Sequence, residues 1–181
     1  MPALVVLLRG VNVGKAKRLP MAEFRALLLQ LGCDQATTLL NSGNAVVLAP
    51  GISPQRLATQ LAAAIIERFG FTVPVVVKSA EEFARIIAAN ELASGAGDHS
   101  RLLVALAQNA TGLSSLRALA SLVEPPERLL HGEHAVYLDC AGALLESKAG
   151  AALLGRLGQA VTTRNWATMQ KLQALVQEAA K

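Results

Sequence analysis

The order of strand-like and helix-like segments in the first half of this chain recurs in the second half. Over residues 3–77, apolar runs rich in Val and Leu alternate with segments whose apolar residues repeat at helical spacing, which gives the order βαββαβ. A Gly- and Ser-containing stretch, 94–98, has the composition of a linker, and the same order of elements follows it. The residues themselves do not repeat between the halves. The sequence therefore predicts an α+β fold, with two tandem ferredoxin-like βαββαβ units and a C-terminal helix.

Glycine, proline and capping residues delimit the segments of the first half. Gly32 and Gly70 suit the left-handed caps that end helices, and Ser53 is a candidate N-cap. The four residues 41–44, Asn-Ser-Gly-Asn, suit a tight primed hairpin turn between two strands. We therefore expect strands over residues 3–8, 36–40, 45–48 and 73–77, one helix that Pro20 opens, and a second helix that ends at Phe69.

The second half follows a linking helix that runs from Ser79 to Asn90. Beyond it, we expect strands over residues 102–106, 128–130, 135–139 and 159–163, helices over 113–123 and 148–157, and a last helix from Asn165. These boundaries predict a first unit over residues 1–80, a linking helix and linker over 81–98, and a second unit with the C-terminal helix over 99–181.

Composition and termini bear on the compartment of the protein. The chain has 181 residues and is 52% hydrophobic, yet it has no run of about 18 apolar residues, so we expect no membrane-spanning helix. Met1 and Pro2 lead straight into a strand-like run, without the basic start of a secretory signal. Cys33 and Cys140 form no CxxC pair, which is typical of free thiols in a reducing compartment. We therefore expect a cytoplasmic protein without membrane contact.

The loop of residues 9–15, Arg-Gly-Val-Asn-Val-Gly-Lys, has the composition of an anion-binding site. It follows the first strand and precedes the first helix, so its glycines, its Asn and its two cations place backbone N–H groups and positive charge together. The charge is uneven, because residues 1–90 carry nine cations against five acids and no acid precedes Glu23. A landing site for phosphate-bearing partners and a solvated basic loop both remain open.

The spacing Gly10-x-x-x-Gly14-Lys15 resembles a phosphate-binding P-loop in part. It is one residue short between the glycines, and it lacks the Ser or Thr after the lysine that would hold magnesium. These departures argue against a nucleoside-triphosphatase loop. Two interpretations remain. One is a looser loop that binds a phosphate or nucleotide, and the other is a structural loop in which the glycines are needed only because they can adopt a positive φ.

The predicted topology brings this loop to the hairpin of residues 41–44. In a ferredoxin-like unit the first and second strands run in the same direction, so both end at the same edge of the sheet. We therefore expect polar residues of the loop and of the hairpin to lie within one surface region. The predicted ligand-binding residues of the first unit are Arg9, Gly10, Asn12, Gly14, Lys15, Ser42, Gly43 and Asn44.

A second candidate segment, Thr-Thr-Arg-Asn-Trp, opens the final helix. Asn165 or Thr163 can cap this helix, whose first N–H groups can also hold an anion. Arg164 beside the helix end gains from a negative partner, either a shared anion or a local acid such as Asp139 or Glu146. We therefore add Thr163, Arg164 and Asn165 to the predicted ligand-binding residues. With a shared anion this group joins the loop of the first unit, whereas with a local acid the two clusters face opposite sides.

The other motifs in the sequence do not indicate a nucleophile, a metal site or RNA recognition. Ser42 lacks the G-x-S-x-G setting of a nucleophile elbow, and turn chemistry explains it. His131 and His134 flank a turn without a third ligand, so we expect no metal and no cofactor. The predicted central strands carry no aromatic residue, which argues against base-stacking RNA recognition.

The function that fits these observations is the binding of a small phosphorylated or other anionic ligand, without catalysis by the protein. One alternative is a transferase-type or hydrolase-type enzyme that uses the same cleft, with Arg9, Lys15 and Arg164 as charge stabilisers. Weak nucleic-acid binding and a protein-interaction module are the others. The sequence discloses neither catalytic residues nor an oligomeric state.

Several segments together resemble a known family, the domain-of-unknown-function 1697 family (DUF1697) of small bacterial proteins. They span nearly the whole chain in the order of the family, with a Lys at position 15 and a Leu at position 39 where relatives usually have Gly and an aromatic. The resemblance implies the fold and the residues of interest, and it implies no assigned chemistry. The segments are Arg9–Gly14, Leu19–Arg25, Asn41–Asn44 and Thr162–Trp166, with Thr168, Lys171 and Leu172.

Overall fold

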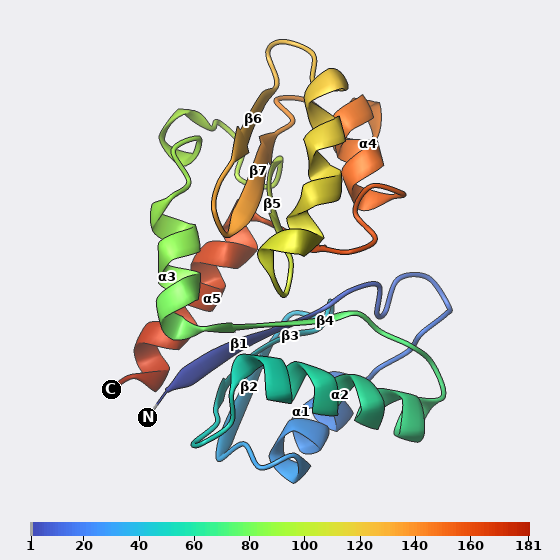
Figure 1. Ribbon diagram of the computed structural model, residues 1–181, viewed down its shortest axis with the longest axis vertical. Coiled ribbons are helices and arrows are strands. Elements are labelled where there is room, and N and C mark those ends of the chain that lie inside the picture. The colour runs from blue at the N-terminus through green and yellow to red at the C-terminus, as the bar shows by residue number, and fades with distance from the viewer. Residues whose placement is uncertain (1) are drawn as a thin grey trace. The chain divides into compact units, whose positions relative to one another are not determined.

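A computed structural model describes residues 2–181 of the chain (Figure 1). The chain divides into two compact units: the first runs to Phe83 and takes in Leu172–Lys181, and the second is Ala84–Lys171. Each unit contains one four-stranded sheet in which all neighbouring strands are antiparallel. The predicted α+β class is therefore confirmed. Within residues 2–181, no helix has both the length and the apolar character needed to cross a bilayer.

The first unit follows the predicted order of elements. In its sheet the strands lie in the order β2-β3-β1-β4, so β1 is central. The last strand begins at Val75, two residues later than expected, because Pro74 has no N–H to give to the ladder. The elements are β1 (Ala3–Leu8), α1 (Met21–Gln30), β2 (Gln35–Leu39), β3 (Asn44–Leu48), α2 (Pro54–Phe69) and β4 (Val75–Ser79).

The capping residues behave largely as predicted. The Ser53 hydroxyl accepts a hydrogen bond from the backbone N–H of Arg56, and α2 then ends at Gly70, whose φ is +77°. Gly32, directly after α1, also has a positive φ, of +97°. Pro20 lies one residue before the first turn of α1, and no side chain caps that turn. The start of α1 therefore keeps backbone N–H groups that no cap satisfies.

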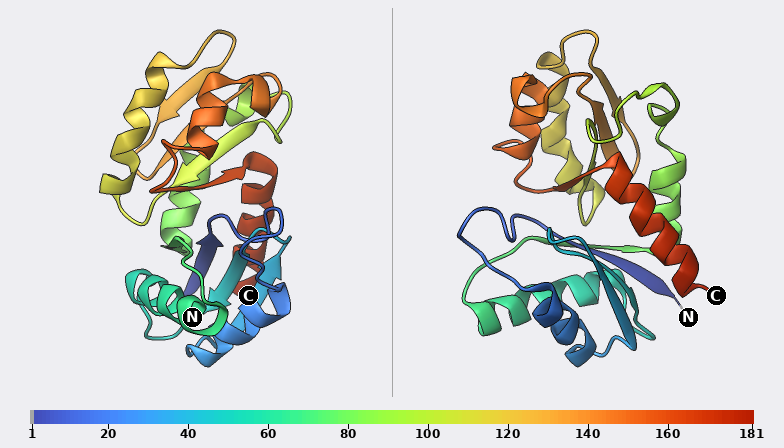
Figure 2. Two further views of the ribbon diagram at one scale, coloured as in Figure 1. Left: turned by 90° about the vertical axis from the view of Figure 1, so that its right-hand side faces the viewer. Right: turned by 180° about the vertical axis from the view of Figure 1, so that it is seen from behind.

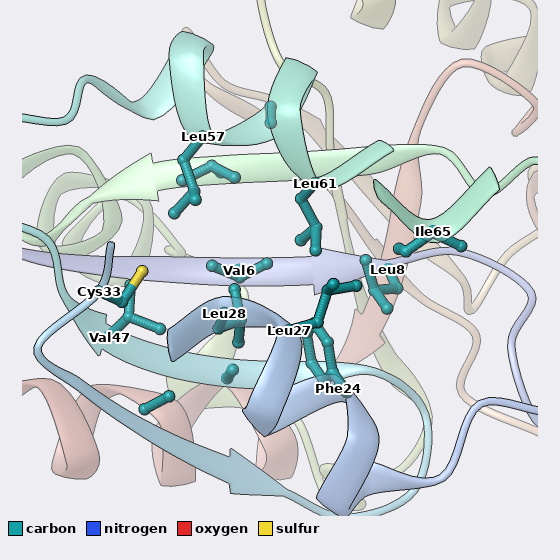
Figure 3. Packing of buried hydrophobic residues seen from close by; sticks show 14 of the residues in the cluster. Val6, Leu8, Phe24, Leu27, Leu28, Cys33, Val47, Leu57, Leu61 and Ile65 are labelled. Atoms are coloured by element: carbon teal, nitrogen blue, oxygen red, sulfur yellow. The ribbon is translucent and has the colours of Figure 1, made fainter. Parts of the chain in front are cut away.

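Helices α1 and α2 cover the same face of the first sheet (Figures 1 and 2). Figure 3 shows Leu57 and Leu61 of α2 on one side of Val6 of β1 in the view and Phe24 of α1 on the other. All four of these side chains are fully buried. Each large aliphatic or aromatic side chain placed in this way contributes about 1.5–3 kcal/mol to the free energy of unfolding. This core fixes the position of β1, and with it the start of the loop that follows.

The second unit has the same order of strands across its sheet, β6-β7-β5-β8. Two helices, η2 and α4, cover one face of this sheet (Figure 2). Helices α3 and α5 each cross the boundary between the two units. The elements are α3 (Ala80–Ala88), η1 (Ala93–Gly95), β5 (Leu102–Leu106), η2 (Ala110–Ser121), β6 (Arg128–His131), β7 (Ala135–Asp139), η3 (Leu144–Glu146), α4 (Lys148–Leu154), β8 (Thr162–Asn165) and α5 (Trp166–Ala179).

Several boundaries in the second unit differ from the sequence prediction. Helix α4 ends at Leu154 where residue 157 was expected, and β6 extends one residue further, to His131. The segment expected as a helix over 113–123 is a 3₁₀-helix that begins at Ala110, because the Asn109 side chain accepts a hydrogen bond from the N–H of Gly112. The last strand was expected over 159–163 and instead spans Thr162–Asn165. Its residues pair with β5 through Asn165, and α5 begins immediately afterwards.

Candidate functional site

The loop between β1 and α1 is fixed by two buried apolar residues. Val11 and Leu19 are 1% and 0% exposed, and both belong to the core of the first unit. Between them, every residue of 13–18 is exposed. We call residues 9–19 the basic loop, and Figure 1 shows it extending beyond the end of β1. Its two anchors hold a short segment with three cations in the solvent.

The side chain of Asn12 closes the basic loop on itself. Its Oδ1 accepts a hydrogen bond from the Leu19 N–H at 2.9 Å, and its Nδ2 donates to the Leu19 carbonyl at 2.8 Å. The same Nδ2 donates to the carbonyl of Asn41 at 2.8 Å, which ties the loop to the hairpin between β2 and β3. The predicted meeting of loop and hairpin is therefore confirmed. All the hydrogens and one lone pair of this amide are used within the protein.

The hairpin itself differs from the predicted turn. Strands β2 and β3 enclose the four residues Leu40–Gly43, and the positive φ angles fall at Leu40 (+57°) and Gly43 (+85°). A two-residue primed turn over 41–44 was therefore the wrong expectation. Gly43 is needed for space as well as for φ, because a Cβ there would lie 2.6 Å from the Cβ of Leu8. Its carbonyl also accepts the Leu8 N–H at 2.8 Å, which continues the pairing of β1 with β3.

Asn44 supports this hairpin from inside. Its side chain is fully buried, and its Nδ2 donates to the Leu39 carbonyl at 3.0 Å and to the Ser42 hydroxyl at 2.9 Å. Ser42 is exposed, whereas Asn12 is half-buried. Asn12 and Asn44 thus form the framework of the predicted site, and a direct contact between either side chain and a ligand stays a prediction.

Three of the exposed side chains of the basic loop are cationic. Lys15, Lys17 and Arg18 are exposed, and none of them has a carboxylate within 4.0 Å anywhere in residues 2–181. Arg9 is half-buried, and desolvation lowers the pKa of its guanidinium from the ordinary value. Lys17 and Arg18 were outside the predicted set of site residues. The sequence feature that could have identified them is the run of cations before Glu23.

Backbone donors accompany these cations. The N–H groups of Gly14, Lys15 and Ala16 donate to no other residue in the described part of the chain. A few residues on, α1 begins without a side-chain cap. Adjacent N–H groups beside a positive-φ glycine and an uncapped helix start are both settings in which proteins hold anions. The basic loop therefore combines directed donors with uncompensated positive charge.

The second candidate segment lies in the second unit. Asn165 caps α5 as predicted, since its Oδ1 accepts the Thr168 N–H at 2.9 Å. Arg164 is buried, and its Nη1 donates to the Thr162 hydroxyl at 2.7 Å and to the Thr163 carbonyl at 3.0 Å. Burial lowers the pKa of Arg164 to about 10, so the side chain stays charged at neutral pH. A ligand contact by Thr163, Arg164 or Asn165 stays a prediction.

The fold and the basic loop together define a two-unit α+β protein with a braced, cation-bearing loop at one edge of its first sheet. A family model described as "Protein of unknown function (DUF1697)" matches residues 1–137, and the chain therefore belongs to this family. A solved structure, that of the conserved bacterial protein SP0830 from Streptococcus pneumoniae, is 23% identical and has a TM-score of 0.78. The match covers 97% of this chain and 98% of that one, and it shows the shared fold. No curated protein matches the chain.

Proposed function

We propose that this protein binds a small phosphorylated or other anionic ligand where the basic loop meets the hairpin of residues 40–43. One observation carries the proposal. Within residues 2–181, the exposed cations of this short segment have no acidic partner, and its adjacent backbone N–H groups have no acceptor. Such donors form charge-assisted hydrogen bonds with an oxyanion, each worth about 1.5–3 kcal/mol. The ligand contacts would come from Lys15, Lys17 and Arg18, with Arg9 at the base of the loop.

The framework supports binding because it holds the loop before a ligand arrives. Asn12 closes the loop through hydrogen bonds to Leu19, and Val11 and Leu19 fasten its two ends to the core. A loop that is already ordered loses less conformational entropy on binding. The glycine at position 14, with φ of +65°, keeps the backbone turned in a way that leaves adjacent N–H groups exposed.

The same residues favour binding over catalysis. Neither residues 9–19 nor residues 40–44 contain a His, Cys, Asp or Glu. These segments therefore supply cations and hydrogen-bond donors, and they contain no carboxylate, imidazole or thiol to act as a base or nucleophile. A base of those kinds would have to come from the ligand or from another part of the chain.

The topology behind the site is itself an inference. We infer that both units are ferredoxin-like, joined through residues 81–98, because each sheet places its first and third strands at the centre. In the first unit β1 and β2 both pair antiparallel with β3, so they run in the same direction and end at one edge. That direction is what brings the basic loop to the hairpin.

A thermal-shift screen tests the proposed function. Inorganic phosphate, sulfate, nucleotides and phosphosugars are added at constant ionic strength, and at least one is expected to raise the Tm. The combined variant Lys15→Gln, Lys17→Gln, Arg18→Gln should lose that rise. Arg56→Gln is the matched control, since Arg56 is an exposed cation of the same unit that lies outside the loop. A screen in which no anion raises the Tm would contradict the proposal.

Nucleic acid is a second candidate, favoured by the row of exposed cations at 15, 17 and 18. Each phosphate contact lowers the slope of log affinity against log salt by about 0.9 for duplex DNA. Retention on a DNA or RNA column at low salt, lost in the triple variant, would support this candidate. Absence of retention at low salt would leave the small anion as the ligand.

A further inference from the structure

A cavity of about 430 Å³ lies in the second unit and plays no part in the proposed function. It is formed where the segment after η1 meets the ends of β6 and β7. Its lining contains two arginines, each of which has a carboxylate within 4.0 Å. The residues that matter for the argument are Gly95, Asp98, Arg101, Arg128 and Asp139.

Arg128 is held through one of its three nitrogens. Its Nη2 donates to Asp139 Oδ2 at 2.7 Å and to the Leu92 carbonyl at 3.2 Å. Asp139 is fixed in turn, because its Oδ1 accepts the Ala141 N–H at 3.1 Å. The Nε and Nη1 groups of Arg128 donate to no other residue within 2–181. The guanidinium is therefore oriented, with three N–H bonds still to be made.

Gly95 makes room for this guanidinium. A Cβ at position 95 would lie 2.9 Å from Nη1 and 3.3 Å from Nη2 of Arg128. The backbone of Gly95 does not have a positive φ, so turn geometry does not call for a glycine here. A side chain at position 95 would therefore displace the guanidinium end of Arg128. Both residues line the cavity.

Arg101 is the second arginine of the lining, and it forms a looser ion pair. Its Nε lies 3.4 Å from Asp98 Oδ2, and Asp98 Oδ1 accepts hydrogen bonds from the hydroxyl and the N–H of Ser100 at 2.6 and 2.9 Å. The hydrogen bond from the Ser100 hydroxyl has the larger effect and the one from the N–H the smaller, and both lower the pKa of Asp98. The backbone of Arg101 is anchored to the end of β7, since its carbonyl accepts the Cys140 N–H at 3.0 Å. The two terminal nitrogens of Arg101 have no acceptor in the described chain.

We propose that this cavity binds the carboxylate or phosphate group of a small molecule through the unused N–H groups of Arg101 and Arg128. The guanidinium of Arg128 is oriented by its two hydrogen bonds, and the planar fork of an arginine matches the geometry of an oxyanion. Arg101, which lines the same cavity, supplies a second guanidinium. The two aspartates balance the charge of the two arginines, so recognition rests on directed hydrogen bonds at short range and depends weakly on salt. This weak dependence on salt distinguishes the cavity from the basic loop, whose exposed cations have no acidic partners among residues 2–181. The volume falls in the range of small-molecule pockets.

NMR titration of the intact protein tests the proposal. Inorganic phosphate and succinate are added in separate series at constant ionic strength, and the amide signals of Gly97 and Ala141 are followed. We expect saturable shifts with at least one of the two anions. Arg101→Gln should raise the Kd by about tenfold, the usual effect of removing a charge-assisted hydrogen bond. Arg156→Gln, which removes an exposed charge elsewhere in the unit, should leave the Kd unchanged.

A second variant shifts the Arg128 guanidinium without changing the charge of the site. Gly95→Ala places a methyl group against Nη1 of Arg128, and we expect the Kd to rise while the fold persists. Gly142→Ala is its control, since a Cβ there meets only the Cys140 carbonyl oxygen, at 3.9 Å. Absence of saturable shifts with both anions, or equal weakening by Arg101→Gln and Arg156→Gln, would overturn the proposal. Because the basic loop is untouched in every variant, the outcome is independent of the function proposed for the first unit.

Discussion

The side-chain amide of Asn12 and the backbone of Leu19 form a reciprocal pair, with one hydrogen bond of 2.9 Å in one direction and one of 2.8 Å in the other. The pair substitutes for the two bonds that a neighbouring strand would give to Leu19. Because Asn12 also reaches the Asn41 carbonyl, one side chain sets the shape of the basic loop and its position on the hairpin. The residue therefore acts as the brace of the candidate site.

Replacing Asn12 should lower the free energy of unfolding for two reasons, and two variants separate them. Asn12→Ala removes three hydrogen bonds, and it places Ala at a φ of +58°, a conformation that Asn tolerates better. We expect a loss of about 2–4 kcal/mol in the free energy of unfolding, measured with urea. Asn12→Gly loses the same bonds without the strain, so its loss should be smaller. A value for Asn12→Ala within about 0.5 kcal/mol of the wild type would contradict the role of the brace.

Gly43 is predicted to be the least replaceable glycine of the hairpin edge. In Gly43→Ala the new methyl group meets Leu8 at 2.6 Å, and the φ of +85° adds strain. Overpacking and left-handed strain together should remove about 2–5 kcal/mol of stability. Gly10→Ala is the matched control, because Gly10 has a φ of +72° and open space around it. Equal losses in the two variants would show that the contact with Leu8 is unimportant.

The exposed cations of the basic loop should contribute little to folding. Since Lys15, Lys17 and Arg18 have no acidic partners in the described part of the chain, their joint replacement by Gln should change the free energy of unfolding by less than about 0.5 kcal/mol per site. Chemical denaturation at low and at moderate salt measures this. A large loss would show that these side chains hold the loop, and loss of ligand binding in the same variant would then have a structural cause.

The buried thiol of Cys140 predicts a loss of stability in alkali. Burial raises the pKa of this thiol from 9.0 to about 11, so the folded state keeps a proton that the unfolded chain releases. The stability that this difference contributes is present below pH 9 and is lost as the pH rises through about 11. We expect a decrease of up to about 2 kcal/mol over that window.

The Cys140 contribution is isolated by comparison with Cys140→Ala. Urea titrations of both proteins from pH 8 to pH 11 should show a steeper fall for the wild type, because the variant has no thiol to titrate there. Parallel curves would contradict the assignment. The same burial predicts slow reaction of Cys140 with a thiol reagent in the native protein and fast reaction after unfolding.

Much of the first unit was readable from the sequence, and the exceptions have physical reasons. Gly70 ends α2 with a left-handed φ as the sequence indicated, since glycine adopts that conformation at little cost. The hairpin was misjudged because its first positive φ falls on Leu40, a residue type that gives no sign of it. The framework roles of Asn12 and Asn44 were equally hidden, because their hydrogen bonds join residues that only the folded chain brings together.

In the second unit, η2 held a signal that we misread as an ordinary helix. Leu113, Leu116 and Leu119 recur at intervals of three, and these are the buried residues of the helix. A helix with three residues per turn stacks such positions on one face, whereas an α-helix turns them progressively away. The spacing therefore favours the 3₁₀ form, and the hydrophobic face of the second unit depends on it.

This geometry makes a last prediction, at Ala120. An α-helix that buries Leu113 would turn residue 120, seven positions later, toward the core, whereas the 3₁₀-helix leaves Ala120 exposed and buries Leu119. Ala120→Lys should therefore change the free energy of unfolding by less than about 0.5 kcal/mol. Leu119→Ala should lower it by about 2–5 kcal/mol, as truncation of a buried leucine does. Urea denaturation of the two variants decides between the helix forms. A large loss in Ala120→Lys with a small one in Leu119→Ala would show that the segment is α-helical.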